Sequence, residues 1–165
     1  MESKYGKYIF EYDNSYQFGV ESAPFKVINR IDGDVEKGFN FYLFHWVMPH
    51  DEPWEVLGHP PHIHKDAELL FHIGTDPNNP QDLGSEIELC LGKEMEKHII
   101  TRTCVIYIPP YFIHCPWKPL KTTRPFIFAQ IHQGPVHTEK GYHQILPPEM
   151  LELVHTTFHD EGFHQ

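Results

Sequence analysis

The sequence predicts an all-β domain, built as a barrel or a sandwich of short strands. Over most of the 165 residues, apolar side chains alternate with polar ones or run in short β-branched and aromatic stretches. Clusters of Gly, Pro, Asn and Asp separate these stretches, as in GTDPNNPQDLG at 74–84. Helical periodicity is almost absent. Many short strands joined by tight turns are typical of two-layered or closed β architectures.

Eight strands are expected along the chain. Turn signals such as Asp32-Gly33-Asp34, Gly92-Lys93 and Pro109-Pro110 lie between them. In order, the expected strands are Pro24–Ile31, Phe41–Met48, His62–Ile73, Glu86–Leu91, Glu96–Thr101, Cys104–Ile108, Ile113–Lys118 and Pro125–His132.

The C-terminal region predicts one short helix near 148–159. Pro147 and Pro148 can occupy its first turn, and Leu151, Val154 and Phe158 recur at spacings of three and four residues. No internal repeat, low-complexity tract or change of composition marks a linker. We therefore expect a single domain over residues 1–165, with a barrel core at roughly 24–132 and a C-terminal extension that carries the helix.

Composition and charge argue against several classes of protein. The 23 acidic residues outnumber the 13 Lys and Arg, the net charge is −10, and no basic cluster occurs, so nucleic acid is not expected as a partner. No apolar run reaches the roughly 18 residues of a membrane span, and the opening MESKYGKYIFEYD lacks the order of a signal peptide. Three cysteines without a CxxC spacing fit a reducing compartment. A cytoplasmic protein with no membrane partner is expected.

Histidine is the outlying residue type, with 14 copies. His62 and His64 lie two positions apart on an expected strand, so both side chains project from one face and can converge on a metal ion. Glu68 shares this parity but would lie about 13 Å from His64 along an unbroken strand. A bend or bulge at 65–67 is therefore required if Glu68 shares the ion. His72 would lie another ~13 Å away, and we leave it out of the site.

These residues resemble the motifs of the cupin superfamily. The first cupin motif contains H-x-H followed by Glu, matched by His62, His64 and Glu68, and the second contains Pro and, five residues later, His, matched by Pro109 and His114. The resemblance covers roughly residues 41–132. It implies a small jelly-roll β-barrel in which these four side chains hold one divalent transition metal, such as Fe, Mn, Ni, Co, Cu or Zn.

The glycines of the two motifs are displaced or replaced. Gly58 and Gly74 fall out of their usual places, and Thr103 and Tyr111 stand where the second motif has glycine. Because Tyr111 occupies a position that often needs φ > 0, a different turn is expected at 109–112.

Further residues are candidates for a substrate pocket. Gln130 and His132 share one face of the last expected strand, and His45, Tyr42 and Trp46 lie on the second. For each of them, the alternative is a surface or structural role.

The resemblance implies a metal-dependent cupin enzyme that acts on a small oxygenated organic molecule. With a redox metal the reaction would be that of a dioxygenase, an oxidoreductase. With a non-redox metal it would be an isomerase, lyase or hydrolase reaction, in which Glu68 or a barrel side chain serves as the catalytic base. A third alternative is a cupin that binds a small molecule without converting it. A homodimer is compatible with the sequence, through an exposed strand edge or the N-terminal segment Tyr5–Tyr12.

Overall fold

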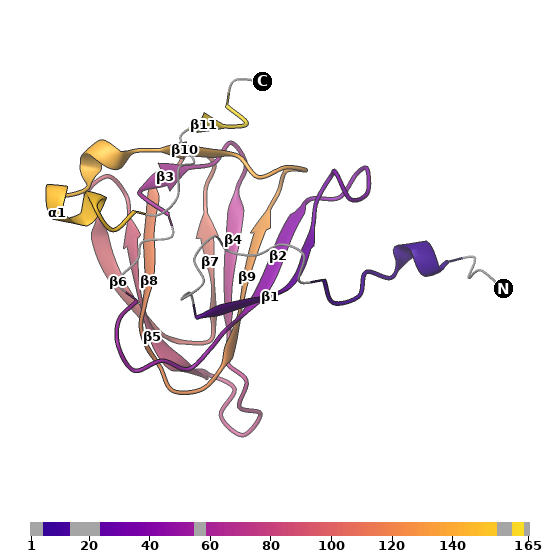
Figure 1. The fold of residues 1–165 in the computed structure, drawn as a ribbon, viewed down its shortest axis with the longest axis horizontal. Helices are drawn as coiled ribbons and strands as arrows, with labels where there is room; N and C mark the ends of the chain where they lie inside the picture. The colour runs from indigo at the N-terminus through magenta and orange to yellow at the C-terminus, as the bar shows by residue number, and fades with distance from the viewer. Residues whose placement is uncertain (1–4, 14–23, 55–58, 155–159, 164–165) are drawn as a thin grey trace.

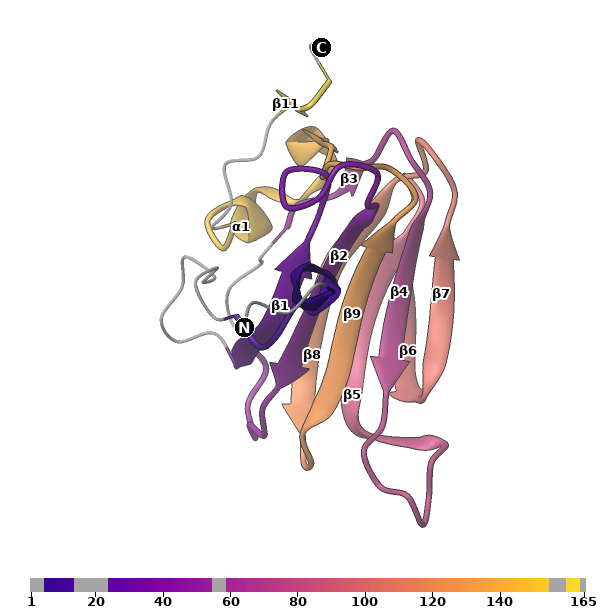
Figure 2. The same cartoon turned by 90° about the vertical axis from the view of Figure 1, so that its right-hand side faces the viewer.

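Two antiparallel β-sheets face each other and enclose the core of the protein (Figures 1 and 2). The computed structural model describes residues 5–13, 24–54, 59–154 and 160–163. The first sheet has the order β1-β2-β9-β4-β7, formed by β1 (Phe25–Ile31), β2 (Phe41–Val47), β9 (Phe126–His132), β4 (Glu68–Ile73) and β7 (Cys104–Ile108). The second has the order β11-β10-β3-β8-β5-β6, formed by β11 (Asp160–Glu161), β10 (Glu139–Gly141), β3 (His62–Ile63), β8 (His114–Thr122), β5 (Asp82–Leu91) and β6 (Glu96–Arg102).

The core forms where the inner faces of the two sheets meet. Strand β2 shows why, because every second side chain is buried, starting at Phe41 and ending at Val47. Full burial of an apolar side chain of this size contributes about 1.5–3 kcal/mol. The main cluster consists of Val47, Leu70, Leu83, Ile87, Leu89, Ile108, Cys115, Phe126 and Phe128.

The expected all-β architecture is confirmed, and the third expected strand is broken as the metal hypothesis required. His62 and Ile63 pair with β8 and β10 in the second sheet, whereas Glu68–Ile73 pairs with β7 and β9 in the first. Between them, at 64–67, the chain crosses from one sheet to the other. This crossing brings Glu68 back beside the histidines.

The C-terminal extension differs from the expectation. The helix α1 covers only Pro148–Leu151, buries none of its residues and has no side-chain cap at its start. The remainder of the expected helix turns at 152–153, and 155–159 lie outside the described residues. The extension instead adds β10 and β11 to the second sheet, so the barrel continues beyond residue 132. Two short 3-10 helices, η1 (Gly6–Tyr8) and η2 (His143–Ile145), complete the described elements.

The turn before β8 also corrects an expectation. Tyr111 itself adopts φ +60°, so the left-handed conformation is kept without glycine. Its backbone N–H donates a hydrogen bond of 2.8 Å to the carbonyl oxygen of His64, and the N–H of Phe112 donates one of 3.2 Å to Pro109. A residue with a side chain costs about 1–2 kcal/mol in the left-handed backbone conformation, and these hydrogen bonds offset that cost.

Gly74, at the end of β4, is expected to tolerate no side chain. A Cβ atom there would lie 2.2 Å from the backbone oxygen of Asp82. Gly74→Ala should therefore lower the free energy of unfolding by about 1–3 kcal/mol, because backbone must move to make room. Urea unfolding measures this, and an unchanged midpoint would contradict the close approach.

None of the helices within the described residues is long and apolar enough to cross a membrane.

Candidate metal centre

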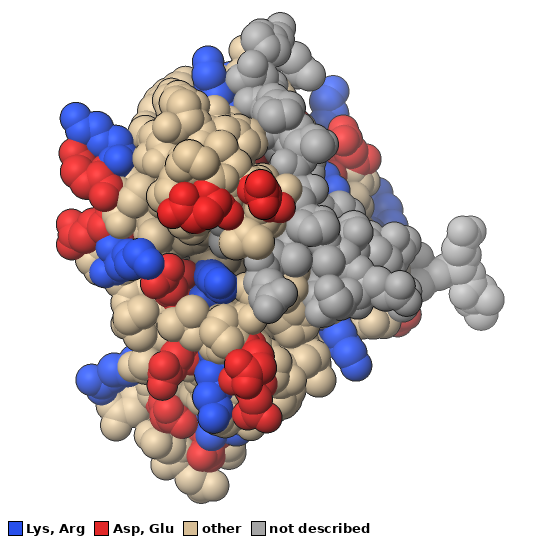
Figure 3. Space-filling view, turned by 60° about the vertical axis from the view of Figure 1, so that its left-hand side comes forward, with Lys and Arg blue, Asp and Glu red and all other residues tan. Residues whose placement is uncertain are grey.

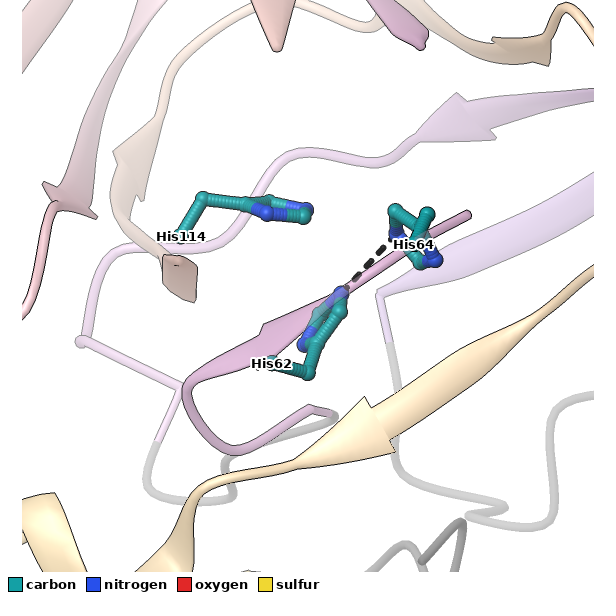
Figure 4. A group of neighbouring side chains, drawn as sticks. All are labelled: His62, His64 and His114. Carbon is teal, nitrogen blue, oxygen red and sulfur yellow. Dashed lines mark hydrogen bonds between the residues drawn. The ribbon is translucent and has the colours of Figure 1, made fainter. Parts of the chain in front are cut away.

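Five buried side chains from both sheets converge at one end of the barrel. His62 lies on β3 opposite His114, the first residue of β8. Glu68 opens β4 opposite His132, the last residue of β9. His64 lies at the crossing between the sheets, and all five side chains are at most 3 % exposed. Figure 4 shows the imidazoles of His62, His64 and His114 turned toward one another.

Backbone carbonyls set the tautomers of three of the histidines. Nδ1 of His62 donates to the carbonyl oxygen of Pro60 (2.7 Å), Nδ1 of His114 to that of Phe112 (3.1 Å), and Nδ1 of His64 to that of Thr138. Because a carbonyl oxygen can only accept, each Nδ1 must carry a proton. In its neutral form, each of these imidazoles therefore points an Nε2 lone pair into the centre, which is the arrangement that metal-binding histidines adopt.

The distance between the inward nitrogens fits a shared ion. Nε2 of His62 lies 3.1 Å from Nε2 of His64. Two lone pairs at this distance repel unless a proton or a metal ion lies between them. Two nitrogens bound at right angles to one ion, at about 2.0–2.1 Å, would be about 2.9 Å apart. The donor set and its spacing therefore fit a transition metal.

The charges of the cluster also suit a cation. Burial raises the pKa of the Glu68 carboxyl, but His64, His114 and His132 together hold it well below its usual range, so Glu68 is ionised. Burial lowers the pKa of His62 well below its usual value, so this imidazole is neutral. Burial opposes protonation of His64, but Glu68 raises its pKa overall. A metal ion bound to Nε2 of His64 would exclude a proton from that atom, so metal affinity should fall as the pH is lowered.

The carboxylate of Glu68 divides its contacts between its two oxygens. Oε2 lies 3.1 Å from Nε2 of His114 and 3.4 Å from Nε2 of His64. Oε1 lies 3.2 Å from Nε2 of His132. His132 thus stands on the side of the carboxylate away from His114, where it can hold the orientation of Glu68.

Replacing His132 by phenylalanine should weaken metal binding about 10- to 100-fold, because the group that orients a ligating carboxylate is lost. His132→Gln should recover part of the affinity, since the amide can still donate to Oε1. Competition with a chromophoric chelator measures both, with His98→Phe on the exposed strand β6 as the control. Equal affinities in all four proteins would contradict this role.

A second layer of charged and imidazole groups lies outside these five residues. Glu139 on β10 is fully buried and lies 2.8 Å from Nδ1 of His59 and 3.6 Å from Nε2 of His137. Despite its burial, His59 and His62 lower the pKa of Glu139. His137 also contacts Glu161 at 2.9 Å. Sequence reasoning missed this layer, because no motif links the C-terminal extension to the H-x-H strand.

The residues expected to line a pocket fall into two groups. Gln130 and His45 lie on the inner face of the sheet, as His132 does. Gln130 is opposite Leu43 on the neighbouring strand, and His45 is opposite Phe128. Gln130 is half-buried, one row of the sheet below His132 and Glu68. His45 lies deeper, packed against Phe25 and Phe128 in the core.

The expected pocket roles of Tyr42 and Trp46 are wrong. Tyr42 is paired with Ile131 and Trp46 with Ile127, positions that alternate with the inner row. Side chains of neighbouring residues on a strand point to opposite faces, so both rings lie on the outer face of the first sheet, away from the histidines.

No protein-family model matches the sequence, and no curated protein matches it either. Solved structures do resemble it. An uncharacterised protein with a double-stranded β-helix domain from Klebsiella pneumoniae is 12 % identical over 87 % of this chain and 98 % of its own, with a TM-score of 0.50. Peruvianin-I, a cysteine peptidase from Thevetia peruviana latex, is 10 % identical over 85 % and 80 %, with a TM-score of 0.53. A recombinant oxalate oxidase solved with glycolate is 11 % identical over 76 % of this chain, which spans 58 % of that protein, with a TM-score of 0.48. Together with the two facing sheets, the two similarities with TM-scores of 0.50 and 0.53 show that the chain has a double-stranded β-helix fold.

Proposed function

We propose that the chain is a metal-dependent enzyme that acts on a small oxygenated organic molecule. His62, His64, Glu68 and His114 would hold one divalent transition metal. The observation that carries this proposal is the set of backbone carbonyls that fix three Nδ1–H groups outward and leave three Nε2 atoms facing an ionised carboxylate. Ordinary buried histidines have no need of this common orientation.

Four protein ligands leave room for a substrate. Three imidazoles and one carboxylate fill four positions of a five- or six-coordinate ion. When bound, the metal supplies Lewis acidity or redox chemistry at its open positions. Gln130 is half-buried on the inner face next to this end of the barrel, and its amide can donate to a substrate oxygen. An apolar wall faces it across β4, where Leu70 and Ile106 belong to the same cross-strand row.

Among the reactions open to such a centre, we favour a dioxygenase. A Lewis-acid isomerase, lyase or hydrolase needs a base that does not bind the metal, and Glu68 has imidazoles within 3.4 Å of both of its oxygens. An oxygen-dependent reaction would need no such base from Glu68, because a redox metal, when bound, would supply that chemistry. A small substrate with two adjacent oxygens, such as a diketone or a diphenol, suits this arrangement.

The test begins with the metal content of untagged protein purified without chelator. About one iron per chain, followed by oxygen uptake with diketones or diphenols, would support the dioxygenase. About one zinc or manganese per chain without oxygen uptake would overturn the dioxygenase and leave the Lewis-acid reactions. No metal, even after reconstitution, would overturn the proposal in favour of a binding protein. His114→Ala should abolish metal uptake, and the exposed His98→Ala should not.

A further inference from the structure

Four side chains of types that bind metals lie beside the metal centre and are not used by it. They are His59, His137, Glu139 and Glu161, and we call them the outer cluster. Nδ1 of His59 lies 2.8 Å from Oε2 of Glu139, and that oxygen lies 3.6 Å from Nε2 of His137. Nδ1 of His137 in turn lies 2.9 Å from Oε2 of Glu161. Imidazoles and carboxylates that alternate at these distances are a donor set for a divalent transition metal.

Glu139 is a fully buried carboxylate without a Lys or Arg partner in the described part of the chain. The basic groups that contact its carboxylate there are the imidazoles of His59, His62 and His137, at 2.8, 3.9 and 3.6 Å. Its Oε1 forms no hydrogen bond with the described residues. On the side of the second sheet, in contrast, acidic side chains lie next to Lys and Arg side chains (Figure 3). Because a buried charge is costly unless it is paired, Oε1 of Glu139 is an acceptor suited to a cation.

Strand pairing places a second carboxylate against this one. Glu161 on β11 is the direct cross-strand partner of Glu139 on β10. Like charges directly opposite each other on neighbouring strands are destabilising. A divalent cation bound to Glu139 would reverse this effect, since Glu161 would then face a positive charge.

Glu161 also sets the orientation of His137. Nδ1 of His137 donates a hydrogen bond of 2.9 Å to Glu161, because a carboxylate can only accept. The neutral ring then directs the lone pair of Nε2 toward Glu139. A carboxylate that accepts the outer N–H of an imidazole is a regular partner of metal-binding histidines.

His59 and His137 lie on either side of the Glu139 carboxylate. Their ring centroids are 6.4 Å apart. Two imidazoles on opposite sides of one ion, with metal–nitrogen distances of about 2.1 Å, have centroids about 6.5 Å apart. Both rings can therefore reach one ion at Glu139 by rotation about their side-chain bonds.

We propose that the outer cluster is a second metal site, which takes a divalent cation such as Zn²⁺. His59, Glu139 and His137 are its ligands, and Glu161 orients His137. The site is separate from the first, because Glu139 lies on the Nδ1 side of the His62 ring, whereas Nε2 of that ring faces the first centre. The Nδ1–H of His62 is bonded to a backbone carbonyl, so His62 serves the first site alone.

The second site should hold its ion more weakly than the first. It has three protein ligands instead of four, and the side chain of His59 is 27 % exposed, so water competes for the ion. We expect a micromolar dissociation constant and loss of this ion during gel filtration. The metal content of purified protein then reports the first site, and added Zn²⁺ reports the second.

Calorimetric titration of the purified full chain with Zn²⁺ tests this inference. The wild type should take up one further equivalent per chain. Glu139→Gln should weaken this uptake by about 100-fold or more, because a ligand is lost, and Glu161→Gln by about tenfold, because the orienting carboxylate is lost. Glu96→Gln is the matched control and should have no effect, since Glu96 forms an exposed carboxylate–imidazole pair with His98 at 3.3 Å on β6.

The first metal is counted before Zn²⁺ is added, so the two sites are judged separately. A wild type that takes up no further equivalent would overturn the inference and leave the first centre intact, as would an equivalent that survives Glu139→Gln. Uptake that Glu139→Gln abolishes in a chain purified without metal would support the second site and count against the first. If Glu139→Gln loses its folded circular dichroism spectrum, Glu161→Gln decides, because this side chain is 42 % exposed; an unchanged affinity would then overturn the inference.

Discussion

His64→Ala is expected to remove stoichiometric metal binding and leave the barrel folded. His64 contributes an inward Nε2 that lies 3.1 Å from that of His62 and 3.4 Å from Oε2 of Glu68. Without it the remaining groups are too few to hold an ion firmly, and we expect at least a 1,000-fold loss of affinity. The fold should survive, because the apolar core lies between the sheets rather than at the crossing.

Elemental analysis and calorimetric titration of the purified variant measure the loss. Circular dichroism and the urea midpoint test the fold independently. His50→Ala is a matched control. His50 lies before the H-x-H strand, and Nδ1 of its ring hydrogen-bonds to the carbonyl oxygen of Met48. Full metal occupancy in a folded His64→Ala protein would refute the proposed ligand set.

Acid should destabilise the fold through two histidines that lie in the core. Burial lowers the pKa of His45 to about 3 and that of His72 to about 4, whereas both have a pKa of 6.5 in the unfolded chain. As the pH falls below 6.5, both histidines bind protons in the unfolded state but not in the folded state. The free energy of unfolding therefore decreases as the pH falls. At pH 5 the loss is about 2 kcal/mol for each histidine.

The double variant His45→Gln/His72→Gln should flatten this pH dependence. Nε2 of His72 accepts a hydrogen bond of 2.9 Å from Trp117, and glutamine can still accept it. Urea unfolding between pH 8 and pH 5 should show that the variant loses about 4 kcal/mol less than the wild type. His59 and His64 have raised pKa values and act in the opposite sense, but they are present in both proteins and cancel. Parallel curves would contradict the prediction.

The sequence reveals the strands and the inner ligands because both depend on local spacing. The H-x-H pair can be recognised from the alternation of side chains along one strand. Because Glu68 would lie too far from His64 on an unbroken strand, the sequence also predicts a break in the strand, and the structure contains it as the crossing at 64–67. Glu139 could not be predicted, since it reaches the site through a three-residue strand whose pairing with β3 is nonlocal.

The face of β2 could not be predicted from its pattern either. Its inner row contains Phe41, Leu43 and Val47, and its outer row contains Tyr42, Phe44 and Trp46. Hydrophobic alternation identifies the buried side of a strand only when the other side is polar. Here both sides are apolar, so the alternation does not indicate which face Tyr42 and Trp46 occupy. The helix expected near 148–159 is confirmed only as the short α1, Pro148–Leu151, because an isolated turn of helix with no buried residue gains little from packing.

The crossing at 64–67 has a mechanical consequence. His62 and His114 belong to the second sheet, while Glu68 belongs to the first. An ion held among them would be a removable cross-link between the two layers at one end of the barrel, in addition to the apolar core that packs between the sheets. Loading the ion should therefore slow amide hydrogen exchange near β3, β10 and the start of β8, and leave the exchange of amides at the far end of the barrel unchanged.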